Sequence, residues 1–220
     1  SIVAPTPMGL DTRQIWVNGP PAERPWIELG ASDVKFGPTG FEITNPKYAY
    51  VGKLARPDRL ELEATGFFTD RYSPVKSING TTVTMQQPAW DNNTWGYDTV
   101  SKPIFPDDSR LFLVNALEFI GKTNDWHARY HQWVIEPEAG KLYLRAGIDE
   151  DIKSLKVVVP TLETLVSISG TPAAPVERLS FRGLTFAHTS WMGPSKPTGY
   201  ANQQSGAYLS DVSPIRPKDA

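Results

Sequence analysis

A chain of 220 residues is long enough for one large domain or two small ones with a hydrophobic core. Its 22 basic and 24 acidic residues nearly balance, so no field of one sign attracts nucleic acid or an anionic membrane. The lack of cysteine excludes a disulfide framework, a zinc–thiolate site and a cysteine nucleophile.

The ends of the chain and its apolar runs bear on processing and on membranes. The longest apolar runs, such as "LKVVVP", are too short to span a bilayer, so we expect no membrane partner. The first residues, "SIVAPTPMGL", lack the charged start and apolar core of a signal peptide, and the chain does not begin with methionine. We therefore expect either a processed product or a piece of a longer protein.

The first two thirds of the sequence predict strands joined by tight turns. The 20 prolines and 17 glycines divide the chain into short extended segments, which is typical of a mostly β protein. In chain order, we expect a strand over 14–17 with a turn at Asn18-Gly19, and a half-buried strand in "DRLELEATGFF". A second Asn-Gly turn, at Asn79, precedes the β-branched run 81–84.

Two further elements are expected before residue 155. Apolar residues Leu111, Val114 and Leu117 fit helical spacing, with Gly121 as a stop, so "SRLFLVNALEFIG" predicts a helix. The sequence "QWVIEPEAGKLYLRAG" predicts a hairpin that pairs 133–135 with 141–145.

After about residue 155 the pattern changes to short β runs without hairpin turns. The runs "LVSIS", "LTFAH" and "AYLS" recur about 20 residues apart, which is typical of a parallel β-helix with one strand per coil. An alternative is a β-sandwich that mimics the period. We predict an antiparallel, sandwich-like β-rich accessory region over 1–154, followed over 155–220 by the first coils of a right-handed parallel β-helix. Phe181, Leu184 and Phe186 are expected to fill its core.

The order of several segments resembles a known architecture. The runs "INGTTVTMQQPAW", "QWVIEPEAGKLYL", "VVVPTLETLVSISG" and "PVERLSFRGLTFAHTSW" are similar to large secreted right-handed parallel β-helix proteins, in which a β-rich region interrupts the early coils. Among groups of known activity, the chain resembles glycoside hydrolase families 141 and 120, which act on fucosides and xylosides. The loop "GKTNDWHARYH" is longer than this resemblance implies. The resemblance implies secretion, an oligosaccharide or polysaccharide ligand, no cofactor, and catalytic carboxylates from coils that would follow Ala220.

Glycoside hydrolysis needs two carboxyl groups on either side of the scissile bond, and neighbouring coils can supply them. In the predicted coil region the acids are Glu163, Glu177 and Asp211. Asp211 follows the strand-like run "GAYLS" and is our candidate catalytic residue, whereas Glu163 and Glu177 fit ordinary surface positions.

A second group of residues suits sugar binding. Aromatic rings stack on apolar sugar faces, and amides bind hydroxyl groups. The candidate substrate-binding residues, drawn from one histidine and the loop that follows it, are His188, Trp191, Tyr200, Gln203 and Gln204. A structural role, in coil stacking for His188 and in the core for Trp191, is the alternative. Trp90, Trp95 and Tyr97 form either a second stacking loop or a hydrophobic plug.

Metal binding and modification have weaker signals. His127 and His131 are four residues apart, but no third ligand is nearby, which favours a solvated loop over a zinc site. The acidic run "GIDEDIKS" lacks EF-hand spacing. Asn79 and Asn92 lie in N-x-[ST] sequons.

Three function classes follow. The first is part of a secreted polysaccharide-acting enzyme, a glycoside hydrolase that uses two carboxylates from β-helix coils. The second is a non-catalytic glycan-binding or structural β-helix protein of the cell surface. A polysaccharide lyase is the third, and the modest charge of the coil region does not favour it. In each case the remainder of the β-helix, as further chain or as a separate chain, is an expected partner.

Overall fold

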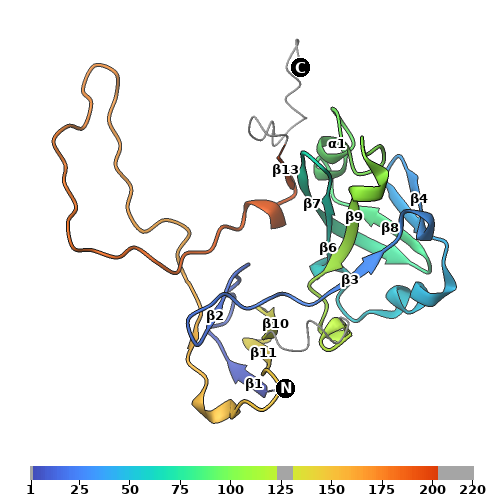
Figure 1. Ribbon diagram of the computed structural model, residues 1–220, viewed down its shortest axis with the longest axis horizontal. Coiled ribbons are helices and arrows are strands. Elements are labelled where there is room, and N and C mark those ends of the chain that lie inside the picture. Colours follow the sequence, from blue (N-terminus) through green and yellow to red (C-terminus); the bar gives the residue numbers. More distant parts are fainter. Residues whose placement is uncertain (1, 123–130, 203–220) are drawn as a thin grey trace.

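The computed structural model describes residues 2–122 and 131–202. Antiparallel strands dominate the described part, with one short α-helix and several short 3-10 helices between them (Figure 1). The strands are β1 (Ile2–Pro5), β2 (Trp16–Val17), β3 (Trp26–Leu29), β4 (Val34–Gly37), β5 (Gly40–Ile43), β6 (Glu61–Thr65), β7 (Asp70–Asn79), β8 (Thr82–Met85), β9 (Arg110–Val114), β10 (Gln132–Glu136), β11 (Lys141–Arg145), β12 (Val157–Val158) and β13 (Tyr200–Asn202). The α-helix is α1 (Ala89–Asn93), and the 3-10 helices are Ala31–Asp33, Pro46–Lys53, Pro57–Arg59, Pro106–Asp108, Leu117–Phe119, Ile152–Ser154 and Gly193–Ser195.

The larger sheet is curled and carries most of the core. Its strand order is β3-β9-β6-β7-β8-β5-β4, and β13 also pairs with β7. The ten-residue strand β7 pairs with β6 through its first half and with β8 through its second half. A register shift between Val75 and Ser77 separates the two halves, and irregularities of this kind bend and twist a strand. The sheet therefore curls into a half-barrel around one hydrophobic cluster, which includes Leu62, Val83 and Trp90.

A second, smaller unit has its own core. β10 and β11 form the expected hairpin, with Trp133 opposite Leu144 and Ile135 opposite Leu142, and β1 adds to the other edge of β11. β2 pairs with β12 beside this sheet. The hydrophobic cluster of this unit includes Ile15 and Val17, which are fully buried. Thus the region predicted as one accessory lobe contains two hydrophobic clusters.

Turn chemistry explains why several predicted strands are confirmed. The predicted half-buried strand is β6, whose residues Leu62 and Ala64 are buried. Asn79-Gly80 connects β7 to β8, and Gly80 has a positive φ of 59°, a conformation that glycine adopts without strain. Asn18 and Gly19 likewise have positive φ at the predicted turn after β2.

The predicted helix over 111–119 is wrong. Residues 110–114 form strand β9, which lies between β3 and β6, and only Leu117–Phe119 makes a 3-10 turn. Leu111 and Leu113 both point into the core from one face of β9. The apolar pattern of this segment fits the period of a helix and that of a strand, in which every second residue lies on the same face. Pairing on both edges therefore determined that the segment is a strand.

The run "AWDNN" is helix α1, and its tryptophan is a core residue. The exposed fraction of Trp90 is 1%, and its indole N–H donates to the carbonyl of Gly37 at 3.1 Å. Trp90 therefore packs in the core of the large sheet and does not form a stacking surface. Asn92 is also buried, so the second sequon is shielded in this fold, whereas Asn79 of the first sequon is exposed.

Between β12 and β13 the chain makes a long excursion from the rest of the molecule (Figure 1). These residues form no strand beyond a single bridge between Thr171 and Ala174. The two arms meet where the N–H of Ser190 donates to the carbonyl of Leu162 at 3.2 Å. The excursion is one open loop.

The expected core residues of the first coil are exposed instead. The exposed fractions of Phe181, Leu184 and Phe186 are 52%, 63% and 52%. A coil buries its inward face only when a neighbouring coil stacks on it, and no described segment covers these three side chains. The described residues therefore do not show parallel β-helix coils, and the segment "AYLS" lies outside them. The β-helix over 155–220 stays a prediction.

Candidate functional site

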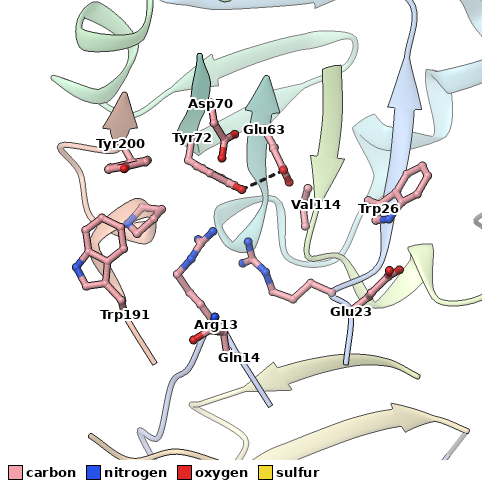
Figure 2. Close-up of a pocket in the computed structure, with 12 residues that line it drawn as sticks. Arg13, Gln14, Glu23, Trp26, Glu63, Asp70, Tyr72, Val114, Trp191 and Tyr200 are labelled. Atoms are coloured by element: carbon pink, nitrogen blue, oxygen red, sulfur yellow. Dashed lines mark hydrogen bonds between the residues drawn. The ribbon is translucent and has the colours of Figure 1, made fainter. Parts of the chain in front are cut away.

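A cavity of about 450 Å³ opens where the large sheet meets the N-terminal segment and the chain that leads into β13 (Figure 2). Its walls combine carboxyl groups, guanidinium groups and aromatic rings. The principal side chains that line it are Glu23, Glu63, Asp70, Arg13, Arg24, Trp26, Tyr72, Trp191 and Tyr200.

Two carboxyl groups enter the cavity from neighbouring strands. Glu63 of β6 is opposite Tyr72 of β7 in the strand register, and Asp70 is two residues before Tyr72. Alternation along a strand places Asp70 and Tyr72 on the same face. The Tyr72 hydroxyl donates to Oε1 of Glu63 at 3.0 Å (Figure 2). The two acids thus occupy diagonal positions on one ladder, where Cβ atoms are separated by somewhat less than about 7–8 Å.

Asp70 also has a polar atom without a partner. Its Oδ1 atom is buried, and no hydrogen-bond partner for it exists among the described residues. A buried carboxylate oxygen without a donor is unfavourable, which makes a protonated carboxyl group or a bound donor the natural ways to satisfy it.

Burial shifts the pKa values of both acids in the same direction. Desolvation raises the pKa of Glu63, the hydrogen bond from Tyr72 opposes this effect, and the charge of Asp70 adds to it. Desolvation likewise raises the pKa of Asp70, and the hydrogen bond from Tyr72 and the charge of Arg13 oppose it. The pKa of Tyr72 is raised by burial and by both carboxyl groups, so its phenol stays a proton donor.

A buried ion-pair network holds the cationic wall in place. Glu61 precedes Glu63 by two residues on β6, and its exposed fraction is 3%. Its Oε2 atom contacts Nη1 of Arg13 and accepts from Nη2 of Arg24 at 2.7 Å. Its other oxygen accepts from the Ser195 hydroxyl at 2.5 Å. One carboxylate thereby joins the N-terminal segment, the sheet and the turn before β13.

The charge state of Glu61 follows from these partners. Burial alone would raise the pKa of Glu61, but the charges of Arg24 and Arg13 and the hydrogen bonds from Arg24 and Ser195 hold it well below its usual range. Arg13 in turn lies over the ring of Tyr72, 5.0 Å from its centroid. The network therefore directs the Arg13 guanidinium toward the acid pair.

Aromatic rings form the end of the cavity nearest β13. Trp191 and Tyr200 meet edge to face, with ring centroids 5.1 Å apart (Figure 2). The exposed fraction of Trp191 is 52%, so a large part of its surface is open to a ligand. A Cβ atom at Gly193 would lie 2.4 Å from the Trp191 ring, so the turn needs glycine where the indole crosses it.

The structure brings two of the predicted binding residues together and separates a third. Trp191 and Tyr200 line the same cavity, and their role in glycan binding stays a prediction. His188 does not line it; its ring lies edge to face with Trp16, 4.8 Å away. Gln203, Gln204 and Asp211, the candidate catalytic residue, lie outside the described residues.

The remaining acids and histidines have ordinary surroundings. Glu163 is exposed and accepts from the N–H of Met192 at 3.2 Å, and Glu177 is exposed. His131 contacts Glu150 at 2.5 Å, while His127 lies outside the described residues. Within residues 2–122 and 131–202, no group of three or more acids and histidines is arranged to hold a metal ion. In the same part of the chain, no helix is long and apolar enough to cross a membrane.

Sequence reasoning missed the acid pair and the arginines. A signal for Glu63 and for the arginine network was present in "LELEAT", where Glu61 and Glu63 share the face of β6 opposite Leu62 and Ala64. Charged residues at alternate positions of a strand flanked on both edges indicate a lined cavity or a buried ion pair.

Comparison with known proteins gives one informative match. No family model matches the chain, and no curated protein matches it. A solved structure named "Glycoside hydrolase" is similar over 88% of this chain, with a TM-score of 0.64 and 24% sequence identity. The match covers 34% of that protein, so this chain spans about a third of its length. At this level of identity the likeness shows a shared fold.

Proposed function

We propose that this chain is part of a glycan-acting enzyme of the glycoside hydrolase class, and that the cavity between Trp191 and Trp26 binds its saccharide. The observation that carries the proposal is the composition of that cavity, which combines half-exposed aromatic rings with charged hydrogen-bonding groups. The fold shared with a protein named a glycoside hydrolase gives independent support.

The cavity matches the chemistry of a sugar. Its volume of about 450 Å³ is within the usual range of small-molecule sites, roughly 300–1,000 Å³. Trp191 and Tyr200 offer apolar surface for the C–H face of a pyranose ring. Arg13 donates hydrogen bonds, while Glu63 and the unpartnered oxygen of Asp70 accept them. Hydroxyl groups, which both donate and accept, complement this mixture.

The acid pair also fits the reaction. Hydrolysis uses two carboxyl groups roughly 5–9.5 Å apart, and the diagonal positions of Glu63 and Asp70 on the ladder are compatible with that range. Asp70, whose buried oxygen lacks a donor, would be the protonated acid that donates to the glycosidic oxygen. Glu63, which accepts from Tyr72, would be the ionised carboxylate that attacks the anomeric carbon or deprotonates the attacking water as the glycosidic C–O bond breaks. The alternative is that the catalytic carboxylates come from β-helix coils, with Asp211 among them.

The exposed loop supports the β-helix part of the proposal. Leu165, Ile168, Phe181 and Phe186 line an apolar hollow of about 350 Å³ on the loop between β12 and β13. Exposed apolar surface of this kind marks an interaction site. We propose that further coils of a right-handed parallel β-helix cover it and that the protein acts outside the cell. Phe186→Ser should then leave the solubility of the 220-residue chain unchanged or improve it, whereas lower solubility would argue against an uncovered coil.

Binding is tested first. Isothermal titration calorimetry with xylo-, cello- and manno-oligosaccharides should reveal a saccharide that the chain binds. Trp191→Ala should weaken that binding by about tenfold, because the lost apolar contact amounts to about 1–2 kcal/mol. Phe67→Ala is the matched control, since Phe67 is exposed, at 58%, and does not line the cavity. Equal losses in both variants, or no binding of any saccharide, would overturn the proposal.

Hydrolysis is tested second, with the bound saccharide as substrate. If the acid pair is catalytic, Glu63→Gln and Asp70→Asn should each lower turnover by at least about a hundredfold while saccharide binding persists. If the coils supply the carboxylates instead, Asp211→Asn should lower turnover in the same assay. Binding without hydrolysis would favour the non-catalytic glycan-binding protein over the enzyme.

A further inference from the structure

A second hollow adjoins the cavity on the other side of Trp26. Its volume is about 570 Å³, and Trp26 lines both the cavity and this hollow. Besides Trp26, its walls include Lys47, Tyr48, Tyr50 and Lys122. The two spaces therefore share one aromatic wall.

Trp26 is held at this boundary by its strand and by a neighbouring ring. It is the first residue of β3 and is opposite Val114 of β9. Its ring meets Phe112 edge to face, with centroids 5.1 Å apart. Figure 2 shows Trp26 at the end of the cavity opposite Trp191 and Tyr200. The cavity is thus elongated, with an aromatic ring at each end and the second hollow beyond one of them.

The second hollow repeats the combination of rings and hydrogen-bond donors. The ammonium of Lys122 lies 3.9 Å from the centroid of the Tyr50 ring, and that of Lys47 lies 5.0 Å from the centroid of Tyr48. Tyr48 is itself anchored, because its hydroxyl donates to the carbonyl of Glu28 at 2.9 Å. Aromatic rings with ammonium donors beside them offer apolar contact together with hydrogen bonds, the combination that suits a hydroxyl-rich ring.

We infer that the cavity and the second hollow are two subsites of one cleft, which binds an oligosaccharide chain across Trp26. The inference rests on the proposed function, because it takes a saccharide as the ligand of the cavity. A glycan that is longer than the cavity must continue past one of its ends. At the Trp26 end, each additional sugar ring gains aromatic and ammonium contacts that a monosaccharide cannot reach.

The test is a chain-length series measured by isothermal titration calorimetry with the full chain. The probes are xylose to xylotetraose, with glucose to cellotetraose and mannose to mannotetraose as parallel series. Affinity should rise by about tenfold or more from the monosaccharide to the tetrasaccharide of the bound series, which corresponds to at least about 1.4 kcal/mol.

Variants assign that gain to the second hollow. The double variant Lys47→Ala/Lys122→Ala should remove most of the gain in affinity between the monosaccharide and the tetrasaccharide. Lys35→Ala/Lys141→Ala is the matched control, because it removes the same charge at two exposed lysines that line neither space. Trp26→Ala should weaken binding at every length, since its ring contacts both subsites.

The outcomes separate the inference from the proposed function. If saccharides bind and Trp191→Ala weakens them, but affinity does not change with length, the inference is wrong and the proposed function stands. A length effect that persists in Lys47→Ala/Lys122→Ala also overturns the inference, because the additional rings then bind elsewhere. If no saccharide binds at any length, the proposed function and the inference both fail.

Discussion

The buried carboxylate of Glu61 offers the sharpest test of how this fold is held together. Glu61→Gln keeps the shape of the side chain but removes its charge. The exposed fraction of Glu61 is 3%, and its carboxylate is paired with Arg13 and Arg24. The substitution therefore leaves two buried guanidinium groups beside each other without their shared counter-charge, while an amide N–H₂ replaces one acceptor.

The magnitude follows from this arrangement. Removing one partner of a buried ion pair costs about 3–5 kcal/mol, because the remaining charge stays buried without compensation. For a chain of this size, 1 kcal/mol corresponds to roughly 2–4 °C in melting temperature, so Glu61→Gln should lower it by about 6–20 °C. The three tethered segments, which include Ser195 before β13, should separate together.

The assay is thermal unfolding followed by circular dichroism, with Glu138→Gln as the matched control. Glu138 is also paired with an arginine, Arg56 at 3.0 Å, but the exposed fractions of their side chains are 65% and 36%. Exposed pairs contribute about 1 kcal/mol or less, so the control should shift the melting temperature by only a few degrees.

The comparison can refute the reasoning directly. If Glu61→Gln unfolds within a few degrees of Glu138→Gln, the Glu61 network does not hold the three segments together. The cationic wall of the cavity would then need another explanation.

Three further predictions concern single positions. The burial that raises the pKa of Asp70 makes the folded wild type bind protons more strongly than the unfolded chain, so its stability falls as pH rises through the raised pKa. Replacing Asp70 by Asn should therefore raise the melting temperature more, or lower it less, at pH 8 than at pH 4. An equal effect at both pH values, or the opposite order, would contradict this. A Cβ at Gly52 would lie 2.1 Å from the carbonyl oxygen of Gly80, so Gly52→Ala should lower the free energy of unfolding, measured in urea, by about 1–3 kcal/mol. Gly37→Ala is the control, because a Cβ there would meet no atom closer than 3.7 Å, and it should be nearly neutral. Trp191→Ala should lower the free energy of unfolding by about 2–3 kcal/mol, because roughly half of the ~150–250 Å² of a tryptophan side chain is buried. A loss above about 4 kcal/mol in urea unfolding would instead indicate a core residue.

The sequence predicted the elements whose signals are local. Hairpin β10–β11 and the β7–β8 connection were predicted because turn residues and alternating apolar residues lie within about 15 positions of one another. The half-buried strand β6 was predicted from Leu60, Leu62 and Ala64 alone. The mostly β class follows from the same signals.

The error over 111–119 and the exposed loop have a different cause. The apolar residues of β9 fit a helix and a strand alike, and only pairing with β3 and β6 selects the strand. The apolar residues of the loop after β12 predict a buried face, but burial depends on a neighbouring coil, and none of the described residues supplies one. Local patterns therefore identify which residues can be buried and leave open what buries them.

The candidate site shows the same division. The sequence by itself selected Trp191 and Tyr200, because aromatic rings in a glycine- and proline-rich loop are typical of sugar binding. Only the tertiary structure placed Glu63 and Asp70 beside them, from strands more than a hundred residues earlier in the chain. Strand register decides which carboxyl groups face one cavity, and register is set by hydrogen bonds and packing between segments distant in sequence, which no single stretch of the chain contains.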